Sequence, residues 1–317
     1  MARRVLVVGG TGLIGGAAAL HLAELGHAVT LMGRTPSRAP ALAGFPFVRA
    51  SYLDASEVAA IPFERFDTLV FAAGNDLRQL PSGEDERAYF RRANSVGVPA
   101  FFEKARAGGL NAAVYVGSYY PDVVPAQRIA ASGYLTSRLE ADEGVRALAS
   151  PDFRACVLNA PFVIGHIAGI GGVIHLEMLV AYLMRRLAPE GPRYAIPGGA
   201  VFMSALSFAE AVAGAIERGE AGKAYLMGDE SWTWERYLNT ILEALGSDER
   251  VIVRDAPNPA LPDIALYAGR TTTVAFEPAA DTVERLRFRR GDVTRVVHEM
   301  VPYYRDQILA HGLASAG

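Results

Sequence analysis

The stretch Val5-Leu6-Val7-Val8-Gly9-Gly10-Thr11-Gly12-Leu13-Ile14-Gly15 decides the fold. Four apolar residues predict a buried strand, the glycines predict a tight turn, and the Ala- and Leu-rich run to residue 25 predicts a helix. Gly9 suits the turn, Gly12 lets a pyrophosphate approach bare backbone, and Gly15 lets the helix pack closely on the sheet. Because a helix N-terminus also supplies N–H donors and partial positive charge, we predict a dinucleotide site here. Its expected contacts are Gly9, Thr11, Gly12, Leu13, Ile14 and Gly15.

A second predicted strand, residues 28–32, is followed by Gly33-Arg34, with Arg38 close behind and no acidic residue in between. A carboxylate at this place would hold the ribose 2′-hydroxyl of NAD, whereas a guanidinium can pair with the 2′-phosphate of NADP. We therefore predict NADP(H) as the cofactor, with Arg34 and Arg38 as contacts. The alternative is NAD, with Arg34 a solvated residue of a surface loop.

Composition narrows the class of protein. The 317 residues are 51% hydrophobic and 21% charged, which is typical of a globular protein with a full core. A net charge of −3 and scattered arginines argue against a nucleic-acid partner. The chain starts directly with a strand pattern, and no apolar stretch reaches the length of a membrane span, so we expect a cytoplasmic protein without a membrane partner. The single cysteine, Cys156, lies in an apolar strand pattern, and the histidines show no metal-binding spacing, so no metal is expected.

Strand and helix patterns alternate through the first half of the chain. Strands are predicted at 5–8, 28–32, 46–50, 67–73, 112–117 and 153–159, and helices at 13–25, 55–60, 87–107 and 134–149. This alternation predicts an α/β fold with a doubly wound parallel sheet of the Rossmann type. A helix at 207–218 and a strand at 223–227 are expected to return to the same sheet.

These patterns also suggest how the chain is divided. A dinucleotide-binding domain is expected to comprise residues 1–164 and about 200–228. A smaller, discontinuous substrate lobe would comprise about 165–199 and 229–317. Because parallel sheets bind ligands beyond the carboxyl ends of their strands, the site residues are sought there.

Two of those strand ends carry further polar residues. Ser118 follows the strand at 112–117, and sixteen residues later Tyr134-Leu135-Thr136-Ser137-Arg138 opens a helix. With the glycine turn and Asn94, these residues resemble the extended short-chain dehydrogenases/reductases of the NAD-dependent epimerase/dehydratase type, nearest the dihydroflavonol-reductase and hydroxysteroid-dehydrogenase branch. The likeness runs over nearly the whole chain. Further counterparts are Asp54, Ala72-Ala73-Gly74, Pro161, Gly165, Ile196-Pro197-Gly198-Gly199 and Glu210.

The resemblance implies a catalytic role for three residues. Tyr134 would be the acid or base at the substrate oxygen, and Ser118 would hold that oxygen by a hydrogen bond. A phenol needs a nearby cation to favour its phenolate, and the family has lysine one helical turn on, where this chain has Arg138. Arginine can stabilise a phenolate but is too basic for a proton relay, so a non-catalytic NADP(H)-binding sensor remains an alternative. The cofactor contacts that the resemblance adds are Asp54, Ala72, Ala73, Gly74, Asn94, Tyr134, Arg138, Pro161 and Phe162.

The predicted substrate is a small, mainly apolar carbonyl or alcohol. Ser118 is followed by Tyr119-Tyr120-Pro121, without the Asp-Glu pair that dehydration needs, which favours simple redox chemistry and leaves sugar-nucleotide epimerisation as an alternative. The pocket has no cluster of basic residues apart from Arg185-Arg186. The resemblance also implies a possible homodimer through the helices at 87–107 and 134–149. The predicted pocket residues are Asn75, Asp76, Tyr119, Tyr120, His166, Met178 and Tyr182.

Overall fold

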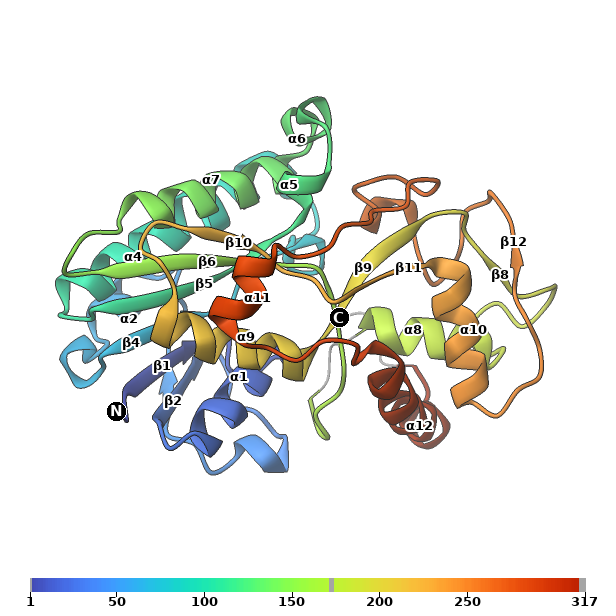
Figure 1. Ribbon diagram of the computed structural model, residues 1–317, viewed down its shortest axis with the longest axis horizontal. Coiled ribbons are helices and arrows are strands. Elements are labelled where there is room, and N and C mark those ends of the chain that lie inside the picture. The colour runs from blue at the N-terminus through green and yellow to red at the C-terminus, as the bar shows by residue number, and fades with distance from the viewer. Residues whose placement is uncertain (1, 171–173, 314–317) are drawn as a thin grey trace.

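The computed structural model describes residues 2–170 and 174–313, and its centre is a seven-stranded sheet (Figure 1). The strand order is β10-β6-β5-β4-β1-β2-β3, and every neighbouring pair is parallel. The predicted α/β fold with a doubly wound parallel sheet is therefore confirmed. The strands are β1 Arg4–Val8, β2 Ala28–Gly33, β3 Phe47–Arg49, β4 Thr68–Phe71, β5 Ala112–Ser118, β6 Arg154–Ala160 and β10 Ala224–Leu226.

Both faces of this sheet are covered, because alternate side chains of each strand enter different cores. Val5 and Val7 of β1 pack into the core under α1 (Leu13–Glu24) and α9 (Ala205–Arg218). Leu6 and Val8 enter a second core with side chains of α4 (Gly97–Ala107) and α7 (Gly133–Ala147). In Figure 1 the two helix layers lie below and above the sheet.

The predicted helix at 87–107 has an unexpected centre. The structure divides it into α3 (Glu86–Phe90), a π-helical segment Arg91–Val96, and α4. A π-helical turn widens the helix by one residue and is frequent at functional sites. Here the widened turn carries the buried Asn94.

The chain between β5 and α7 forms two short helices, α5 (Tyr120–Val123) and α6 (Ala126–Ala131). A third short helix, α2 (Ala55–Ala59), follows β3. The sequence pattern gave no indication of α5 and α6, because neither is long enough to show a helical period.

The C-terminal elements pack beside the carboxyl ends of the sheet strands (Figure 1). Three helices, α8 (Ile174–Leu183), α10 (Trp234–Ala244) and α12 (Val293–His311), pack on one another. A three-stranded sheet joins them to the main sheet, in the order β11 (Glu230–Thr233), β9 (Gly199–Ser204), β7 (Phe162–Ile164). The remaining elements are β8 (Tyr194–Ala195), β12 (Ile252–Val253) and α11 (Ala280–Leu286).

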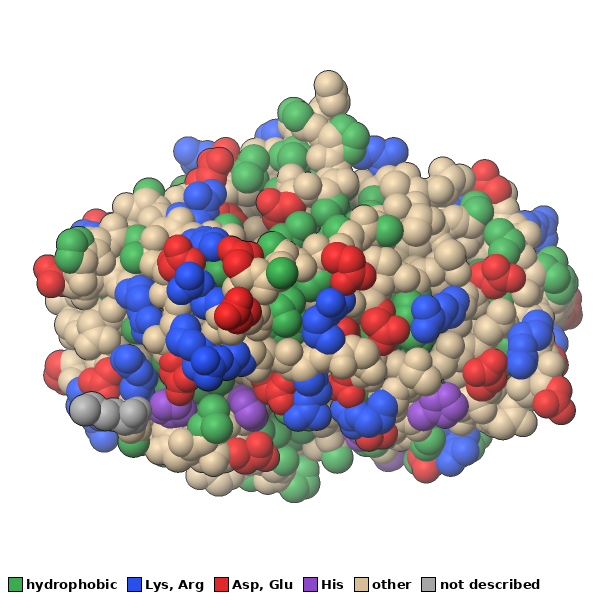
Figure 2. Space-filling model, viewed as in Figure 1, with side chains coloured by type: hydrophobic (Ala, Val, Ile, Leu, Met, Phe, Trp, Pro, Cys, Tyr) green, Lys and Arg blue, Asp and Glu red, His purple; other side chains and the backbone are tan. Residues whose placement is uncertain are grey.

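Two stretches of the predicted C-terminal lobe, residues 171–173 and 314–317, lie outside the described residues. Among the helices that the structure describes, none combines the length and the apolar character that crossing a membrane requires. The surface around α9 and α11 shows arginines next to carboxylates (Figure 2). Arg289 pairs with Glu210 at 2.6 Å and Arg285 with Glu220 at 2.9 Å, so basic charge on this face is largely paired.

Candidate active site

Two positions of the glycine turn after β1 require glycine. Gly9 has φ +78°, and a β-carbon there would lie 2.7 Å from the carbonyl carbon of Ala72, at the end of β4. A β-carbon on Gly15 would overlap the carbonyl oxygen of Gly9. A β-carbon on Gly12, by contrast, would have only the carbonyl oxygen of Gly9 within 4 Å, at 3.6 Å. The space next to Gly12 is therefore open.

The N-terminus of α1 lies at this open space. Its N-cap residue is Gly12, which offers no side-chain cap, and the first turn contains no acidic residue. The first N–H groups of a helix have no partner within the helix, so these donors suit an anion. The turn therefore fits a dinucleotide pyrophosphate, and the contacts of Thr11, Leu13 and Ile14 stay predictions.

Arg34 lies just beyond β2, and its side chain is exposed, as is that of Arg38. Neither guanidinium has a hydrogen-bond or ion-pair partner among residues 2–170 and 174–313. Arg34 is close enough to Tyr89 to oppose the burial that raises the pKa of that phenol. Asp54 follows β3, as expected. Its carboxylate caps α2 by accepting from the N–H groups of Ser56 (2.9 Å) and Glu57 (3.1 Å), so the structure assigns it this capping role, and its contact to a cofactor stays a prediction.

Tyr134 and Ser118 meet at the carboxyl end of β5. Ser118 is the last residue of that strand, and Tyr134 lies in the first turn of α7, which Ser132 caps. Each is 8% exposed, and the Ser118 hydroxyl is close enough to the Tyr134 phenol to lower its pKa. Burial raises the pKa of the Tyr134 phenol, while Arg138 and the Ser118 hydroxyl act in the opposite direction, and burial prevails.

Arg138 lies one turn further along α7. Its guanidinium is 6% exposed and donates from Nη2 to the carbonyl oxygen of Val116 at 2.9 Å. It also lies 5.5 Å from the ring centre of Tyr115. No carboxylate forms an ion pair with this guanidinium in the described part of the chain, although the charge of Asp76 raises its pKa from a longer distance. Arg138 thus places an unneutralised positive charge beside Tyr134, and a guanidinium stays charged at any ordinary pH.

The side chain of Asn94 links two segments of the site by hydrogen bonds. Its side chain is 0% exposed and binds the backbone of Asn75 twice, accepting from N at 3.2 Å and donating to O at 3.1 Å. It also donates to the hydroxyl of Ser137 at 3.0 Å. These bonds fix the loop after β4 to α7, and the contact of Asn94 with a cofactor stays a prediction.

Four of the seven predicted pocket residues gather near Tyr134. Asn75 and Asp76 lie in the loop after β4, and the negative charge of Asp76 raises the pKa of Tyr134. Arg78 pairs with this carboxylate at 2.6 Å. Tyr119 and Tyr120 follow Ser118, with their ring centres 4.5 Å apart.

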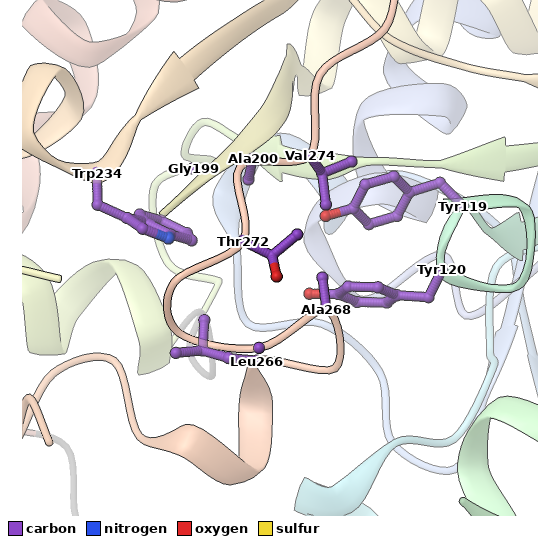
Figure 3. A pocket seen from close by; sticks show the side chains of 10 residues that line it. Tyr119, Tyr120, Gly199, Ala200, Trp234, Leu266, Ala268, Thr272 and Val274 are labelled. Atoms are coloured by element: carbon purple, nitrogen blue, oxygen red, sulfur yellow. The ribbon is translucent and has the colours of Figure 1, made fainter. Parts of the chain in front are cut away.

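Figure 3 shows how Tyr119 and Tyr120 point away from the sheet, toward the loop that carries Ala268 and Thr272. A small cavity between these two rings and the loop has room for about one water molecule. Trp234 and Leu266 lie on its far side (Figure 3). The two tyrosines are thus one contact between the main sheet and the C-terminal elements.

The other three predicted pocket residues lie elsewhere. Tyr182 is 1% exposed in the C-terminal core, where its hydroxyl accepts from the backbone N–H of Tyr194 at 3.0 Å. His166 stacks on Tyr303 of α12, with ring centres 4.8 Å apart. Met178 packs against the main core. Tyr182 and Met178 thus pack as an apolar stripe of a helix usually does, and a contribution of these three residues to a substrate pocket stays a prediction.

Two residues near the site were not predicted. Tyr267 stacks on Tyr134, with ring centres 4.8 Å apart and an interplanar angle of 22°. Burial lowers the pKa of His175 in α8 to about 4. The charge of Arg78 lowers this pKa further, and that of Asp76 raises it. Neither residue belongs to a motif, and each is brought to the site by the folding of distant segments. The sequence alone offered no sign of either.

The remaining predicted cofactor residues lie around the same strand ends. Ala72, Ala73 and Gly74 follow β4, and Gly74 contacts Arg138. Pro161 follows β6, and the ring of Phe162 packs edge-on against His175 at 5.0 Å. Their contacts with a cofactor stay predictions. Within the described ranges, no group of three or more His, Cys, Asp or Glu side chains could hold a metal ion.

Several solved structures share this fold. UDP-glucose-4-epimerase from Stenotrophomonas maltophila, with bound NAD and formylated UDP-arabinopyranose, is 17% identical over 97% of this chain and 99% of that chain, with a TM-score of 0.78. The Bordetella bronchiseptica enzyme WbmH, in complex with NAD+, is 18% identical over 98% and 100%, with a TM-score of 0.72. UDP-N-acetylglucosamine 4-epimerase from Methanobrevibacter ruminantium M1, in complex with UDP-N-acetylmuramic acid, is 15% identical over 96% and 99%, with a TM-score of 0.72.

At these identities the likeness shows the fold. A search of curated proteins found no matching relative. The family assignment comes from the sequence itself, because residues 5–228 match the family model described as the NAD dependent epimerase/dehydratase family. This match includes the glycine turn, Ser118, Tyr134 and Arg138. The chain therefore belongs to the NAD dependent epimerase/dehydratase family, whose members have the extended short-chain dehydrogenase/reductase fold.

Proposed function

We propose that the protein is an NADP(H)-dependent reductase or dehydrogenase of a small, mainly apolar carbonyl/alcohol pair. The observation that carries this proposal is the buried pair of Ser118 and Tyr134, together with the charge of Arg138 that acts on the Tyr134 phenol. Such a pair can hold one substrate oxygen and exchange one proton with it.

The roles of the three residues follow from their surroundings. Ser118 orients the substrate oxygen, and the Tyr134 hydroxyl gives its proton to that oxygen in reduction or removes it in oxidation. The positive charge of Arg138 makes the phenolate less unfavourable, against the effect of burial. A bound nicotinamide would supply or accept the hydride. Because Arg138 cannot release its own proton, the proton must return to Tyr134 by another route.

The choice of NADP(H) rests on Arg34 and Arg38. Both are exposed beyond the end of β2, and neither is paired with a carboxylate in the described part of the chain. A free guanidinium at this place suits the 2′-phosphate. In the proposed division of the chain, residues 1–164 and about 200–228 hold the cofactor, and the rest shapes the substrate pocket.

The proposed substrate class rests on the surroundings of Tyr134. Two aromatic rings pack against that of Tyr134, namely Phe90 at 5.3 Å and Tyr267 at 4.8 Å between ring centres. Asp76 and Arg78 neutralise each other at 2.6 Å. Arg185 is exposed and pairs with Glu249 at 3.0 Å, so it offers little to a diphosphate. These surroundings favour an apolar substrate over a charged sugar nucleotide.

Epimerisation is the second candidate. The family match and the epimerases among the similar structures favour it. An epimerase would use its dinucleotide transiently and return it to its original state in each turnover. A third reading, a sensor that binds NADP(H) without turnover, is favoured only by Arg138 in the place of lysine.

The experiment that separates the three measures the nicotinamide absorbance during incubation of NADPH with a panel of small ketones. A reductase consumes NADPH steadily, in proportion to the ketone supplied. An epimerase interconverts UDP-sugars with no net change in absorbance, and a sensor binds NADPH stoichiometrically and converts nothing. Steady consumption with any ketone supports the proposal, and its absence across the panel rejects it.

A further inference from the structure

Tyr267 comes from a loop far along the chain, between the turn Asp263–Ala265 and α11. Its ring lies almost parallel to that of Tyr134, at 4.8 Å and 22°. The ring of Tyr120 also meets it edge-on, at 5.1 Å and 66°. Tyr267 is thus the one ring of the C-terminal elements, among those described, that stacks on the proposed acid or base.

The hydroxyl group of Tyr267 has no hydrogen-bond partner in residues 2–170 and 174–313, although its oxygen is buried. Burial raises the pKa of this phenol, and the strongest electrostatic influence on it is Tyr134. The two phenols are therefore close enough to influence each other electrostatically. A buried hydroxyl without a partner is costly and uncommon in folded proteins. Since phenylalanine would stack equally well without this cost, the unpartnered hydroxyl indicates a ligand atom that completes it.

The loop that carries Tyr267 is held from two sides. Arg128 of α6 donates from Nη1 to the backbone oxygen of Tyr267 at 3.1 Å. On the other side, the N–H of Gly199 in β9 donates to the oxygen of Thr272 at 3.2 Å. Arg270 also pairs with Asp263 at 2.9 Å within the loop. The ring is therefore a fixed wall of the site, which is what a residue that selects a substrate by its shape requires.

We propose that Tyr267 contacts the substrate and selects carbonyl compounds that carry a flat, unsaturated ring with a second oxygen atom. The ring of Tyr267 packs against the flat ring, and its hydroxyl donates to the second oxygen. This inference rests on the proposed function, because it places the substrate next to Tyr134. Aromatic rings gain from stacking on one another beyond the area that they bury, and a saturated ring has no such face.

The first test compares acetophenone with cyclohexyl methyl ketone, which has the same carbon skeleton without the flat ring. In Tyr267→Leu, kcat/KM with NADPH should fall roughly two- to tenfold for acetophenone and stay within about twofold for the cyclohexyl ketone. A matched control is Tyr303→Leu, which removes a ring stacked on His166 at the same 4.8 Å. It should leave the ratio of the two substrates unchanged. Equal losses for both ketones in Tyr267→Leu would overturn the proposal.

The second test examines the hydroxyl group. Tyr267→Phe should keep the activity on acetophenone and lose roughly tenfold on one of the three hydroxyacetophenone isomers. If the wild-type protein prefers none of these isomers over acetophenone, the second oxygen is not recognised, and that part of the proposal is wrong.

A binding measurement separates this inference from the proposed function. Saturation-transfer NMR on the protein loaded with NADPH reports the binding of both ketones in the Tyr134→Phe background, where no turnover is expected. Preference for acetophenone that depends on Tyr267 supports the contact even if no ketone is reduced by the wild type. Absence of that preference overturns the contact even if ketones are reduced.

Discussion

Gly74 and Arg138 fit together only as a pair. A β-carbon on Gly74 would overlap Nη1 of Arg138, so the absence of a side chain at the end of β4 makes the space that the guanidinium fills. The guanidinium in turn reaches the carbonyl oxygen of Val116 on β5. The arginine that replaces the family's lysine is therefore built into the sheet end, and it brings its charge to Tyr134 from there.

Gly74→Ala should displace Arg138. We expect a loss of about 1–3 kcal/mol in the free energy of unfolding, because the added methyl group overpacks a buried site. The activity should fall as well. Urea denaturation measures the first effect. Gly44→Ala is the control, since a β-carbon on Gly44 has nothing within 4 Å and should change neither quantity. A Gly74→Ala protein with unchanged stability and activity would contradict the described packing.

The charge of Arg138 should appear in the pH dependence of the reaction. Arg138 lowers the pKa of Tyr134 against the effect of burial, so its removal should raise that pKa. In the direction of alcohol oxidation, where Tyr134 acts as base, the rise of kcat in Arg138→Gln should move to higher pH. Arg138→Lys keeps the charge and should keep the profile closer to that of the wild type. Identical profiles for all three proteins would show that the charge does not act on the ionising group.

Arg34→Ala tests the choice of cofactor. Loss of a charge-assisted bond to the 2′-phosphate should weaken NADPH binding roughly tenfold or more. NADH binding should be unchanged, and titration of both nucleotides into the protein gives the ratio. Arg65→Ala is the control, because Arg65 precedes β4 and so lies at the amino ends of the strands. An unaltered ratio in Arg34→Ala would reject the proposed 2′-phosphate contact.

His175 should make the stability depend on pH. Burial lowers its pKa to about 4 in the folded protein, below its ordinary value of about 6.5. Above pH 6.5, His175 is neutral in both the folded and the unfolded protein. As the pH falls toward 4, the imidazole binds a proton in the unfolded protein but not in the folded protein, and the free energy of unfolding decreases. Between these limits the wild type should lose roughly 2 to 3 kcal/mol more than His175→Gln, measured by urea denaturation at each pH. The exposed His298→Gln serves as control, and a wild-type curve that parallels that of His175→Gln would contradict the assignment.

The parts of the protein that the sequence predicted are those with local patterns. The strands and helices around the main sheet follow from hydrophobic periodicity, and the glycine turn follows from the steric needs of Gly9 and Gly15. Ser118 and Tyr134 could be found because each comes at a definite place, a strand end and a helix start.

The parts that the sequence missed depend on contacts between distant segments. For Tyr182 and Met178, a pocket wall and a core have the same apolar helical spacing, so the sequence could not predict that both side chains pack with the core. Tyr267 reaches Tyr134 through a loop without regular structure, which Arg128 and β9 hold in place. Asn94 lies in a π-helical turn, and no sequence period predicts such a turn.

The most direct test of the account compares the wild type with Tyr134→Phe, by the consumption of NADPH in the presence of the ketone panel and by the affinity for NADPH alone. Removal of the hydroxyl should leave NADPH affinity within about twofold and lower kcat by roughly a hundredfold or more, as loss of a general acid does. If Tyr134→Phe consumes NADPH as fast as the wild type, Tyr134 is not the acid of the reaction, and the proposed function of the site is wrong.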